Sequence, residues 1–206
     1  MDLAHPYTAV TPTLEGAILA VLARTTRPIS GRDVARLTGR SQAGVSRAIG
    51  RLADQGIVNV QEAPPSLLYT LNRDHLLAPA VLLLANARTT LWSRIAEEVN
   101  AWDVLPEHLS VFGSAARGDG DVESDIDILV VRPRGVRADD PRWRPQLEIL
   151  SDHIYRWTGN RAGLAEMSAS EVSSLRETQP MIAAELRADA ITLIGPSPAE
   201  LLKVRG

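Results

Sequence analysis

The residues with the clearest chemical potential are two aspartates that lie two positions apart in an aliphatic run. Asp125 and Asp127 belong to the stretch DIDILVV. Alternation along a strand places both carboxylates on one face and the isoleucines on the other. Two ionised carboxylates at this spacing repel each other unless a cation lies between them. Since Mg²⁺ prefers one or two carboxylates together with phosphate oxygens, the pattern predicts a metal site that a phosphorylated ligand completes.

A turn of small residues precedes the acidic strand. Gly113-Ser114 ends the apolar strand 109–112, and Ala-Ala-Arg then begins a short helix that Gly118 ends. Gly113 has no side chain to keep a ligand from the backbone, and the free N–H groups of a helix start attract anions. Ser114 either caps this helix or donates its hydroxyl to a ligand. No Gly-Lys-Ser/Thr follows, so the turn is not a Walker loop.

The order of these residues resembles the signature of a known superfamily. Gly-Ser, then Arg-Gly, then Ser-Asp-x-Asp with apolar residues after it is similar to the DNA polymerase β nucleotidyltransferases. The pattern looks most similar to the minimal nucleotidyltransferases, which often occur as antitoxin partners of HEPN proteins. The resemblance covers about residues 105–195, including ADAITLIG as the last strand of the fold.

The resemblance implies Mg²⁺-dependent transfer of NMP from an NTP, with ATP favoured, to a hydroxyl group. Gly113 and Ser114 would hold the β- and γ-phosphates. Asp125 and Asp127 would ligate two Mg²⁺ ions. The acceptor would be a protein, a tRNA or a small molecule.

Three further residues have roles that the resemblance leaves more open. Arg117 would steady the loop or neutralise phosphate charge, and Ser124 would cap or orient the first aspartate; a structural role is open for both. A third carboxylate on a later strand normally completes such a site and activates the attacking hydroxyl. In RAGLAEMSASE the internal acid is Glu166, a glutamate where the family usually has aspartate. We predict Glu166 as the third ligand; as a solvated edge-strand residue instead, it would leave a site that transfers poorly.

The first part of the chain has the pattern of a second, smaller fold. Helical spacing extends over residues 13–25, 30–38 and 41–56, and alternation on both sides of Pro64-Pro65 predicts a β-hairpin. Three helices and a hairpin resemble the winged helix-turn-helix domains of bacterial transcriptional regulators.

The third of these helices has the features of a recognition helix. Val45, Ile49 and Leu52 share one face. The candidate DNA-binding residues are three arginines on the opposite face and three polar residues near the helix start: Arg40, Arg47, Arg51, Ser41, Gln42 and Ser46. An arginine stripe suits a phosphate-lined groove, and base edges are usually met by the start of the helix. Protein docking, dimerisation or a vestigial role are the alternatives.

The chain is therefore predicted to be α+β, with a winged helix at 1–77, a connecting helix at 78–103 and a nucleotidyltransferase domain at 104–206. The nucleotidyltransferase domain should contain a mixed sheet flanked by helices. The connecting helix either joins the domain cores or packs across a dimer, and a homodimer on a two-fold DNA site is expected.

Composition limits the remaining possibilities. The 206 residues include no cysteine, so disulfides and cysteine-based metal sites are excluded. The net charge is −3. No segment predicts a secretory signal or a membrane span, and we expect a cytoplasmic protein. The leading hypothesis is a regulatory or toxin–antitoxin enzyme that binds DNA, with a toxin protein or tRNA as a further partner. The alternative is a transcriptional regulator whose nucleotidyltransferase-like domain senses nucleotide or binds a partner.

Overall fold

The computed structural model describes residues 1–202 and divides the chain into two compact units. The N-terminal unit is His5–Thr90, and the C-terminal unit contains Met1–Ala4 and the residues from Leu91 onward. This division differs from the boundaries predicted from the sequence. Residues 1–4 belong to the C-terminal unit because Leu3, 1% exposed, is part of its hydrophobic core.

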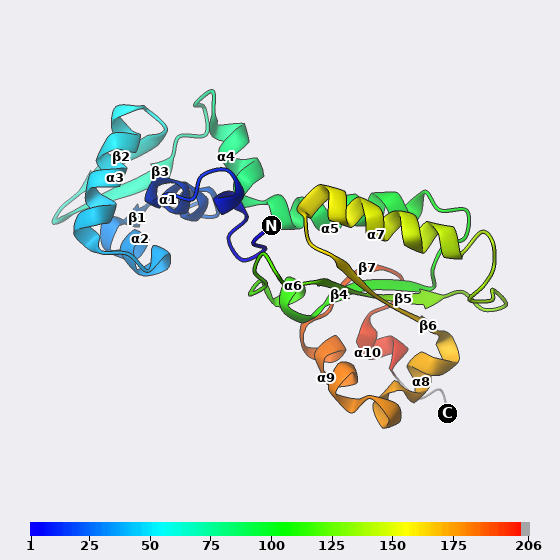
Figure 1. Ribbon diagram of the computed structural model, residues 1–206. Coiled ribbons are helices and arrows are strands. Elements are labelled where there is room, and N and C mark those ends of the chain that lie inside the picture. Colours follow the sequence, from blue (N-terminus) through cyan, green and yellow to red (C-terminus); the bar gives the residue numbers. More distant parts are fainter. Residues whose placement is uncertain (203–206) are drawn as a thin grey trace. The chain divides into compact units, whose positions relative to one another are not determined.

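The N-terminal unit contains the helices and the hairpin that the sequence predicts (Figure 1). Its elements are η1 (Pro6–Ala9), α1 (Leu14–Ala23), β1 (Ile29–Ser30), α2 (Gly31–Thr38), α3 (Gln42–Asp54), β2 (Val58–Ala63), β3 (Ser66–Leu71) and α4 (Ala78–Ala85). The strands form an antiparallel sheet in the order β1-β3-β2.

Local sequence explains where these helices begin and end. The hydroxyls of Thr13, Ser30 and Ser41 each accept a backbone N–H of the first turn of α1, α2 and α3. Gly39 ends α2 with a left-handed φ of 65°, which glycine adopts without steric cost. The predicted inward residues Val45, Ile49 and Leu52 are buried in the core of the unit.

The connecting helix predicted at 78–103 is two helices. α4 ends at Ala85 and α5 (Ala87–Asn100) begins after Asn86, whose own backbone is not helical. The carbonyl of Asn86 accepts both the backbone N–H and the hydroxyl of Thr90, at 2.9 and 3.1 Å. The break therefore lies close to the boundary between the two units at Thr90 and Leu91.

The C-terminal unit has a mixed sheet with helices on both faces, which confirms the predicted fold class. After α5 its elements are β4 (His108–Phe112), α6 (Gly113–Arg117), β5 (Ile126–Arg132), α7 (Arg144–Thr158), β6 (Ala162–Ser168), α8 (Ala169–Thr178), α9 (Pro180–Asp189), β7 (Ile191–Ile194) and α10 (Pro198–Leu201). The strand order is β6-β5-β4-β7, with β5 and β6 parallel and the other neighbours antiparallel.

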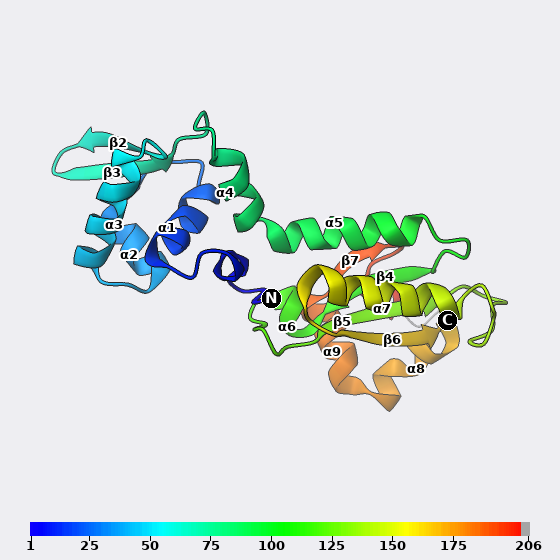
Figure 2. The same cartoon turned by 45° about the horizontal axis from the view of Figure 1, so that its top comes forward.

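The two faces of this sheet bury different sets of side chains. On one face Ile126, Ile128 and Val130 of β5 pack in a core with α5 and α7. On the other face Leu129 and Val131 pack with α8, α9 and the end of α10. Figures 1 and 2 show these helix groups on opposite sides of the sheet. Across residues 1–202, every helix is too short or too polar to serve as a membrane span.

Candidate functional site

The two predicted aspartates lie at the start of the central strand β5. Asp125 is exposed just before the strand, and Asp127 is half-buried within it. Asp127 pairs with Phe112 of β4 on one side and with Gly163 of β6 on the other. By alternation its carboxylate is on the face that α8 and α9 cover.

Two glycines leave the space that the Asp127 carboxylate occupies. A Cβ at Gly113 would lie 2.7 Å from Oδ2 of Asp127, and a Cβ at Gly163 would lie 2.7 Å from Oδ1. Gly113 also has a left-handed φ of 68°. Any other residue at either position would push this carboxylate from its place. Gly113 was predicted from the sequence; Gly163 was not, because its position depends on the register between β5 and β6.

The electrostatic setting of Asp127 favours a cation. Burial raises the pKa of Asp127 above its usual value, and the charges of Asp125 and Glu185 raise it further, whereas Arg117 lowers it. Within residues 1–202, no three acidic or histidine side chains are arranged to hold a metal ion. Two carboxylates that are completed by phosphate oxygens nevertheless fit Mg²⁺, which commonly binds in this way.

The structure places the other predicted loop residues close by, in roles partly different from those expected. α6 begins directly after its N-cap residue Phe112, so Ser114 lies inside the helix, and the alternative that it caps this helix is wrong. Arg117 forms ion pairs with Asp119 of the following loop at 3.2 Å and with Asp189 at 3.5 Å, and the second pair links α6 to α9. The Ser124 hydroxyl donates to Asp121 Oδ1 at 2.8 Å and so closes the loop before the strand instead of bonding to Asp125.

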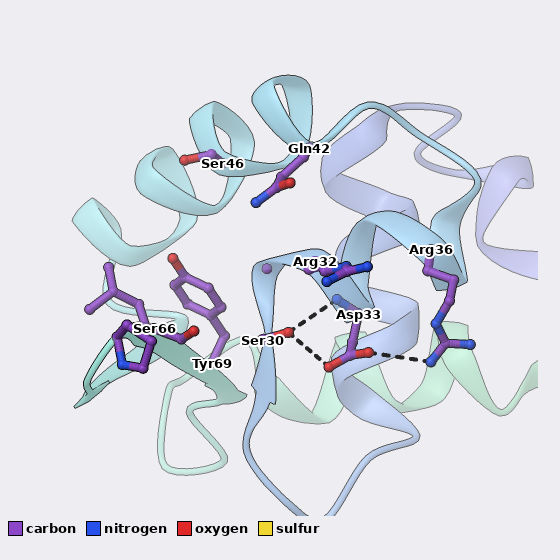
Figure 3. A pocket seen from close by; sticks show the side chains of 11 residues that line it. Ser30, Arg32, Asp33, Arg36, Gln42, Ser46, Ser66 and Tyr69 are labelled. Carbon is purple, nitrogen blue, oxygen red and sulfur yellow. Dashed lines mark hydrogen bonds and ion pairs between the residues drawn. The ribbon is translucent and has the colours of Figure 1, made fainter.

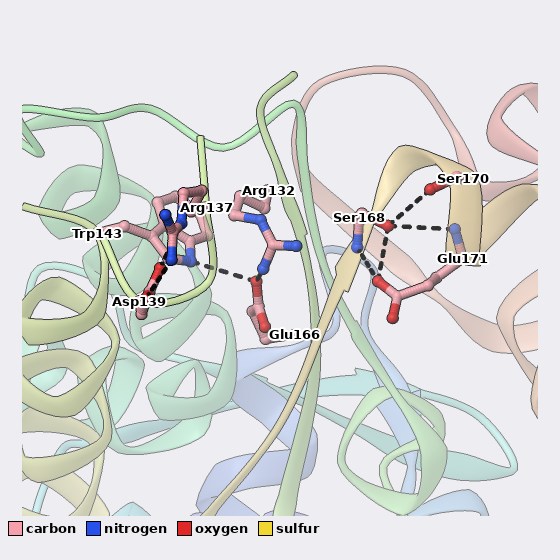
Figure 4. Close-up of polar contacts among 8 residues, drawn as sticks. All are labelled: Arg132, Arg137, Asp139, Trp143, Glu166, Ser168, Ser170 and Glu171. Atoms are coloured by element: carbon pink, nitrogen blue, oxygen red, sulfur yellow. Dashed lines mark hydrogen bonds and ion pairs between the residues drawn. The ribbon is translucent and has the colours of Figure 1, made fainter. Parts of the chain in front are cut away.

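The prediction of Glu166 as the third ligand is wrong. In the parallel register Glu166 pairs with Val130 and therefore lies on the opposite face from Asp127. It is also three residues farther along the strands, about 10 Å at 3.3 Å per residue. Figure 4 shows the Glu166 carboxylate in an ion pair with Arg132, and it also accepts the indole N–H of Trp143 at 3.3 Å.

A carboxylate that the sequence did not indicate lies near Asp127. Glu185 is an exposed residue of α9, and its charge contributes to the raised pKa of Asp127. α9 packs against α6 and β4, which carries Glu185 to this side of the sheet. Only the folded arrangement of α9 brings it there, and no spacing in the sequence could have found it.

Replacing Gly113 by Ala is expected to cost about 1–2 kcal/mol of stability, because alanine is strained at a left-handed φ. It should also weaken Mg²⁺-dependent nucleotide binding, because the new methyl group would displace the Asp127 carboxylate and supply no carboxylate in its place. Chemical denaturation and calorimetric titration with Mg²⁺ and NTP measure the two effects. Gly135→Ala is the matched control: its φ is 82°, but a Cβ there meets nothing within 4 Å. Equal nucleotide binding by the two variants would contradict the assigned place of Asp127.

The N-terminal unit has a polar groove of about 790 Å³ between α2, α3 and the hairpin. Figure 3 shows Gln42 and Ser46 on α3 facing the start of α2 and the ring of Tyr69. The polar lining also includes Ser30 before α2, Arg32, Asp33 and Arg36 of α2, and Ser66 of the hairpin. The sequence prediction missed these residues, because α2 and the hairpin meet α3 only in the folded unit.

The six predicted DNA-binding residues, of which Arg40 and Ser41 precede α3, are all exposed, but they do not all line the groove. Gln42 and Ser46 do, whereas Ser41 is the N-cap residue of α3. Arg51 pairs with Glu15 of α1, so part of its charge is used within the unit. Arg47 donates Nε–H to the carbonyl of Ala43 at 3.4 Å, which leaves the rest of its guanidinium available.

Comparison with known families agrees with both halves of this description. Residues 10–66 match the model of the MarR family, and residues 93–174 match the model of the nucleotidyltransferase domain. The chain joins a MarR-like winged helix to a nucleotidyltransferase domain. No curated protein matches it in sequence.

Solved structures with partial similarity include a transcriptional regulator and a toxin–antitoxin. RV1404 from Mycobacterium tuberculosis is 23% identical over 47% of this chain and 68% of its own, with a TM-score of 0.34. A toxin–antitoxin with AMP-PNP is 16% identical over 54% and 80%, with a TM-score of 0.37. The regulator BldR from Sulfolobus solfataricus is 17% identical over 50% and 72%, with a TM-score of 0.32. Each alignment covers about half of this chain, and none of them assigns an activity to it.

Proposed function

We propose that the nucleotidyltransferase domain binds an NTP with Mg²⁺ and transfers NMP to a hydroxyl acceptor, while the winged helix binds DNA. The observation that carries the proposal is the setting of Asp127. It lies beside Asp125, between Gly113 and Gly163, at the sheet end where α6 begins. A cation bound between the two carboxylates would offset their repulsion, and the phosphates of an NTP at the glycine turn would complete its coordination.

Each residue of the site has a role that its position supports. Gly113 and Ser114 would hold the phosphates, and Asp125 and Asp127 would hold the metal. When bound, Mg²⁺ would neutralise the triphosphate and stabilise charge that develops during transfer. Arg117, which bridges α6 and α9, would keep the phosphate-binding turn in place.

Transfer requires a proton acceptor in addition to these groups. The acceptor oxygen would form a bond to the α-phosphorus, the bond from that phosphorus to the oxygen bridging to the β-phosphate would break, and pyrophosphate would leave. The hydroxyl proton must pass to a base. Because the residue beside Asp127 on β6 is Gly163, the base would be Glu185 of α9 or a group of the acceptor itself.

Labelled nucleotide tests the transfer directly. With ATP tried first, α-labelled NTP and Mg²⁺ should label an acceptor supplied as protein, tRNA or small molecule, and γ-labelled NTP should release labelled pyrophosphate. Label transferred from the γ-position would indicate a kinase and would contradict the proposal. The Asp125→Asn/Asp127→Asn double variant is the control, and transfer that survives in it would exclude this site.

The glycine at position 163 favours a second candidate function, nucleotide sensing. The site lacks a carboxylate at the strand position next to Asp127, so the domain could bind Mg²⁺ and NTP without efficient transfer. The chain would then be a transcriptional regulator that senses nucleotide. Tight NTP binding with no transfer to any acceptor would distinguish this sensor from the enzyme.

DNA binding by the winged helix would link either function to the control of transcription. A DNA reader attached to a nucleotidyltransferase suits a protein that controls its own operon and modifies or binds a toxin partner. A homodimer on a two-fold DNA site is the expected assembly. NTP and DNA as ligands favour a cytoplasmic location.

Arg47→Ala is expected to weaken binding to a short mixed-sequence DNA duplex. The slope of log K against log[salt] should fall in magnitude by about 1. The reason is that one exposed guanidinium of α3 would lose its phosphate contact. Fluorescence anisotropy over a series of salt concentrations measures both quantities. Arg51→Ala should have a smaller effect, since Arg51 already pairs with Glu15. If neither variant differs from the wild type, protein docking becomes the better hypothesis for this unit.

A further inference from the structure

A buried asparagine outside the sequence motif contacts the loop that carries Asp125. We call residues 118–125, between α6 and β5, the acidic loop. Asn160 follows Gly159, which ends α7 with a left-handed φ of 78°, and Asn160 is 2% exposed. Its side-chain amide donates to the carbonyl oxygens of Ser124 at 3.0 Å, Asp121 at 3.3 Å and Val122 at 3.5 Å. One amide group therefore donates to three of the carbonyl oxygens in the turn before Asp125.

The acidic loop is closed on itself and is held as one piece. Oδ1 of Asp121 accepts the backbone N–H of Glu123 at 3.0 Å and of Ser124 at 2.9 Å, and also the Ser124 hydroxyl. These short-range bonds shape the turn but do not attach it to the sheet. Asn160 supplies that attachment, next to the point where Ile126 N–H donates to the Arg161 carbonyl at 2.8 Å.

The first residues of the chain strengthen the same attachment. The backbone N–H groups of Leu3 and Ala4 donate to the Gly120 carbonyl at 3.1 and 3.2 Å. Oδ1 of Asn160 accepts a hydrogen bond from the Met1 nitrogen at 2.6 Å. Both polar ends of the Asn160 amide are thus satisfied, as a buried amide requires.

We infer that Asn160 is a positioning residue, which holds the acidic loop so that Asp125 stays beside Asp127. The loop needs such a hold because Asp125 is exposed, lies outside the strand and has the same charge as Asp127. Without an attachment, repulsion would move Asp125 away from the place where a metal and a triphosphate need it. Asn160 touches no ligand. This role rests on the proposed function, in which the site binds Mg²⁺ and an NTP.

The test compares Asn160→Ala with Gln146→Ala at the other end of α7. Gln146 is a half-buried amide that makes two hydrogen bonds to the backbone of Val104, at 3.1 and 3.2 Å. It is about 20 Å from Asn160 along the helix at 1.5 Å per residue. Both variants remove an amide-to-backbone attachment, but only Asn160→Ala loosens the acidic loop.

Two measurements are made on the metal-free and Mg²⁺·ATP-treated full chain. In Asn160→Ala, hydrogen exchange of amides 119–125 should rise roughly tenfold or more, and the Kd for Mg²⁺·ATP should rise by a similar factor. Gln146→Ala should change neither. Unchanged exchange in Asn160→Ala, or faster exchange with unchanged Kd, would overturn the positioning role.

Further outcomes separate this inference from the proposed function. Wild-type protein that binds none of the four NTPs would refute the proposed function itself, and the positioning role with it. If Asn160→Ala does not fold, Asp121→Ala loosens the same loop from an exposed position. A wild-type Kd in that variant, despite faster loop exchange, would show that the loop's position does not matter and would overturn the role.

Discussion

Replacing Asp127 by Asn is expected to weaken Mg²⁺-dependent NTP binding strongly and, at the same time, to stabilise the metal-free protein. The binding loss should be on the order of 100-fold, because the central metal-binding carboxylate is removed from the site. The shape of the side chain is retained, so the contacts to Gly113 and Gly163 remain possible. Calorimetric titration and thermal unfolding measure the two effects.

The stability gain follows from the raised pKa of Asp127. A carboxyl group whose folded pKa is above its unfolded value of about 3.9 binds its proton more tightly in the native state. Between the unfolded and folded pKa values the stability therefore falls as the pH rises, and above the folded pKa the full penalty remains. The amide of the Asp127→Asn variant does not ionise, so this variant would escape the penalty at neutral pH.

The expected gain in Tm is roughly 1–3 °C at pH 7, since the carboxylate is only half-buried and partly screened. It should shrink as the pH falls toward about 3.9, where the unfolded wild-type carboxyl also becomes protonated. Asp125→Asn should lose binding with a smaller gain, because Asp125 is exposed. A lower Tm for Asp127→Asn at neutral pH would contradict the electrostatic description of the site.

Replacing Gly163 by Asp is expected to raise the rate of nucleotidyl transfer by about tenfold or more, since a positioned general base typically contributes about 10²–10⁴-fold. The new carboxylate would lie beside Asp127 on the same sheet face, where the later strand has none. The backbone of Gly163 is outside the left-handed region, so an L-residue is not strained there. Its Cβ would lie 2.7 Å from Oδ1 of Asp127 and would displace that carboxylate, as a Cβ at Gly113 would, so the expected gain requires the new carboxylate to compensate for the displaced one.

Gly163→Asn is the control for this displacement, because it adds the same volume without the charge. Steady-state transfer from α-labelled NTP and unfolding with and without Mg²⁺ compare the two variants. The Asp variant should be less stable without metal, through repulsion among three carboxylates, and should gain more from Mg²⁺. Equal transfer by both variants would show that the missing carboxylate does not limit the wild type.

The parts of the fold and of the site that depend on residues close in sequence could be predicted from the sequence. Asp125 and Asp127 share a strand face because alternation is local, and the N-caps Ser30 and Ser41 follow from single hydroxyl groups before helical runs. The hairpin turn at Pro64-Pro65 was likewise visible.

The parts that depend on how distant segments pair could not be predicted. The sequence shows that Glu166 lies on a later strand, but only the β5–β6 register shows that its side chain is on the face opposite to Asp127. The same register puts Gly163 beside Asp127. Glu185 and Asn160 reach the site through the packing of α9 and the end of α7, which no periodicity encodes.

The measurement that tests the proposed site most directly is calorimetric titration of the full chain with each of the four NTPs, with and without Mg²⁺. We predict that at least one NTP binds at a single site, that binding requires Mg²⁺, and that the Asp125→Asn/Asp127→Asn double variant loses it. Absence of binding by the wild type, or equal binding without Mg²⁺ and in the double variant, would contradict a metal-dependent nucleotide site at these aspartates.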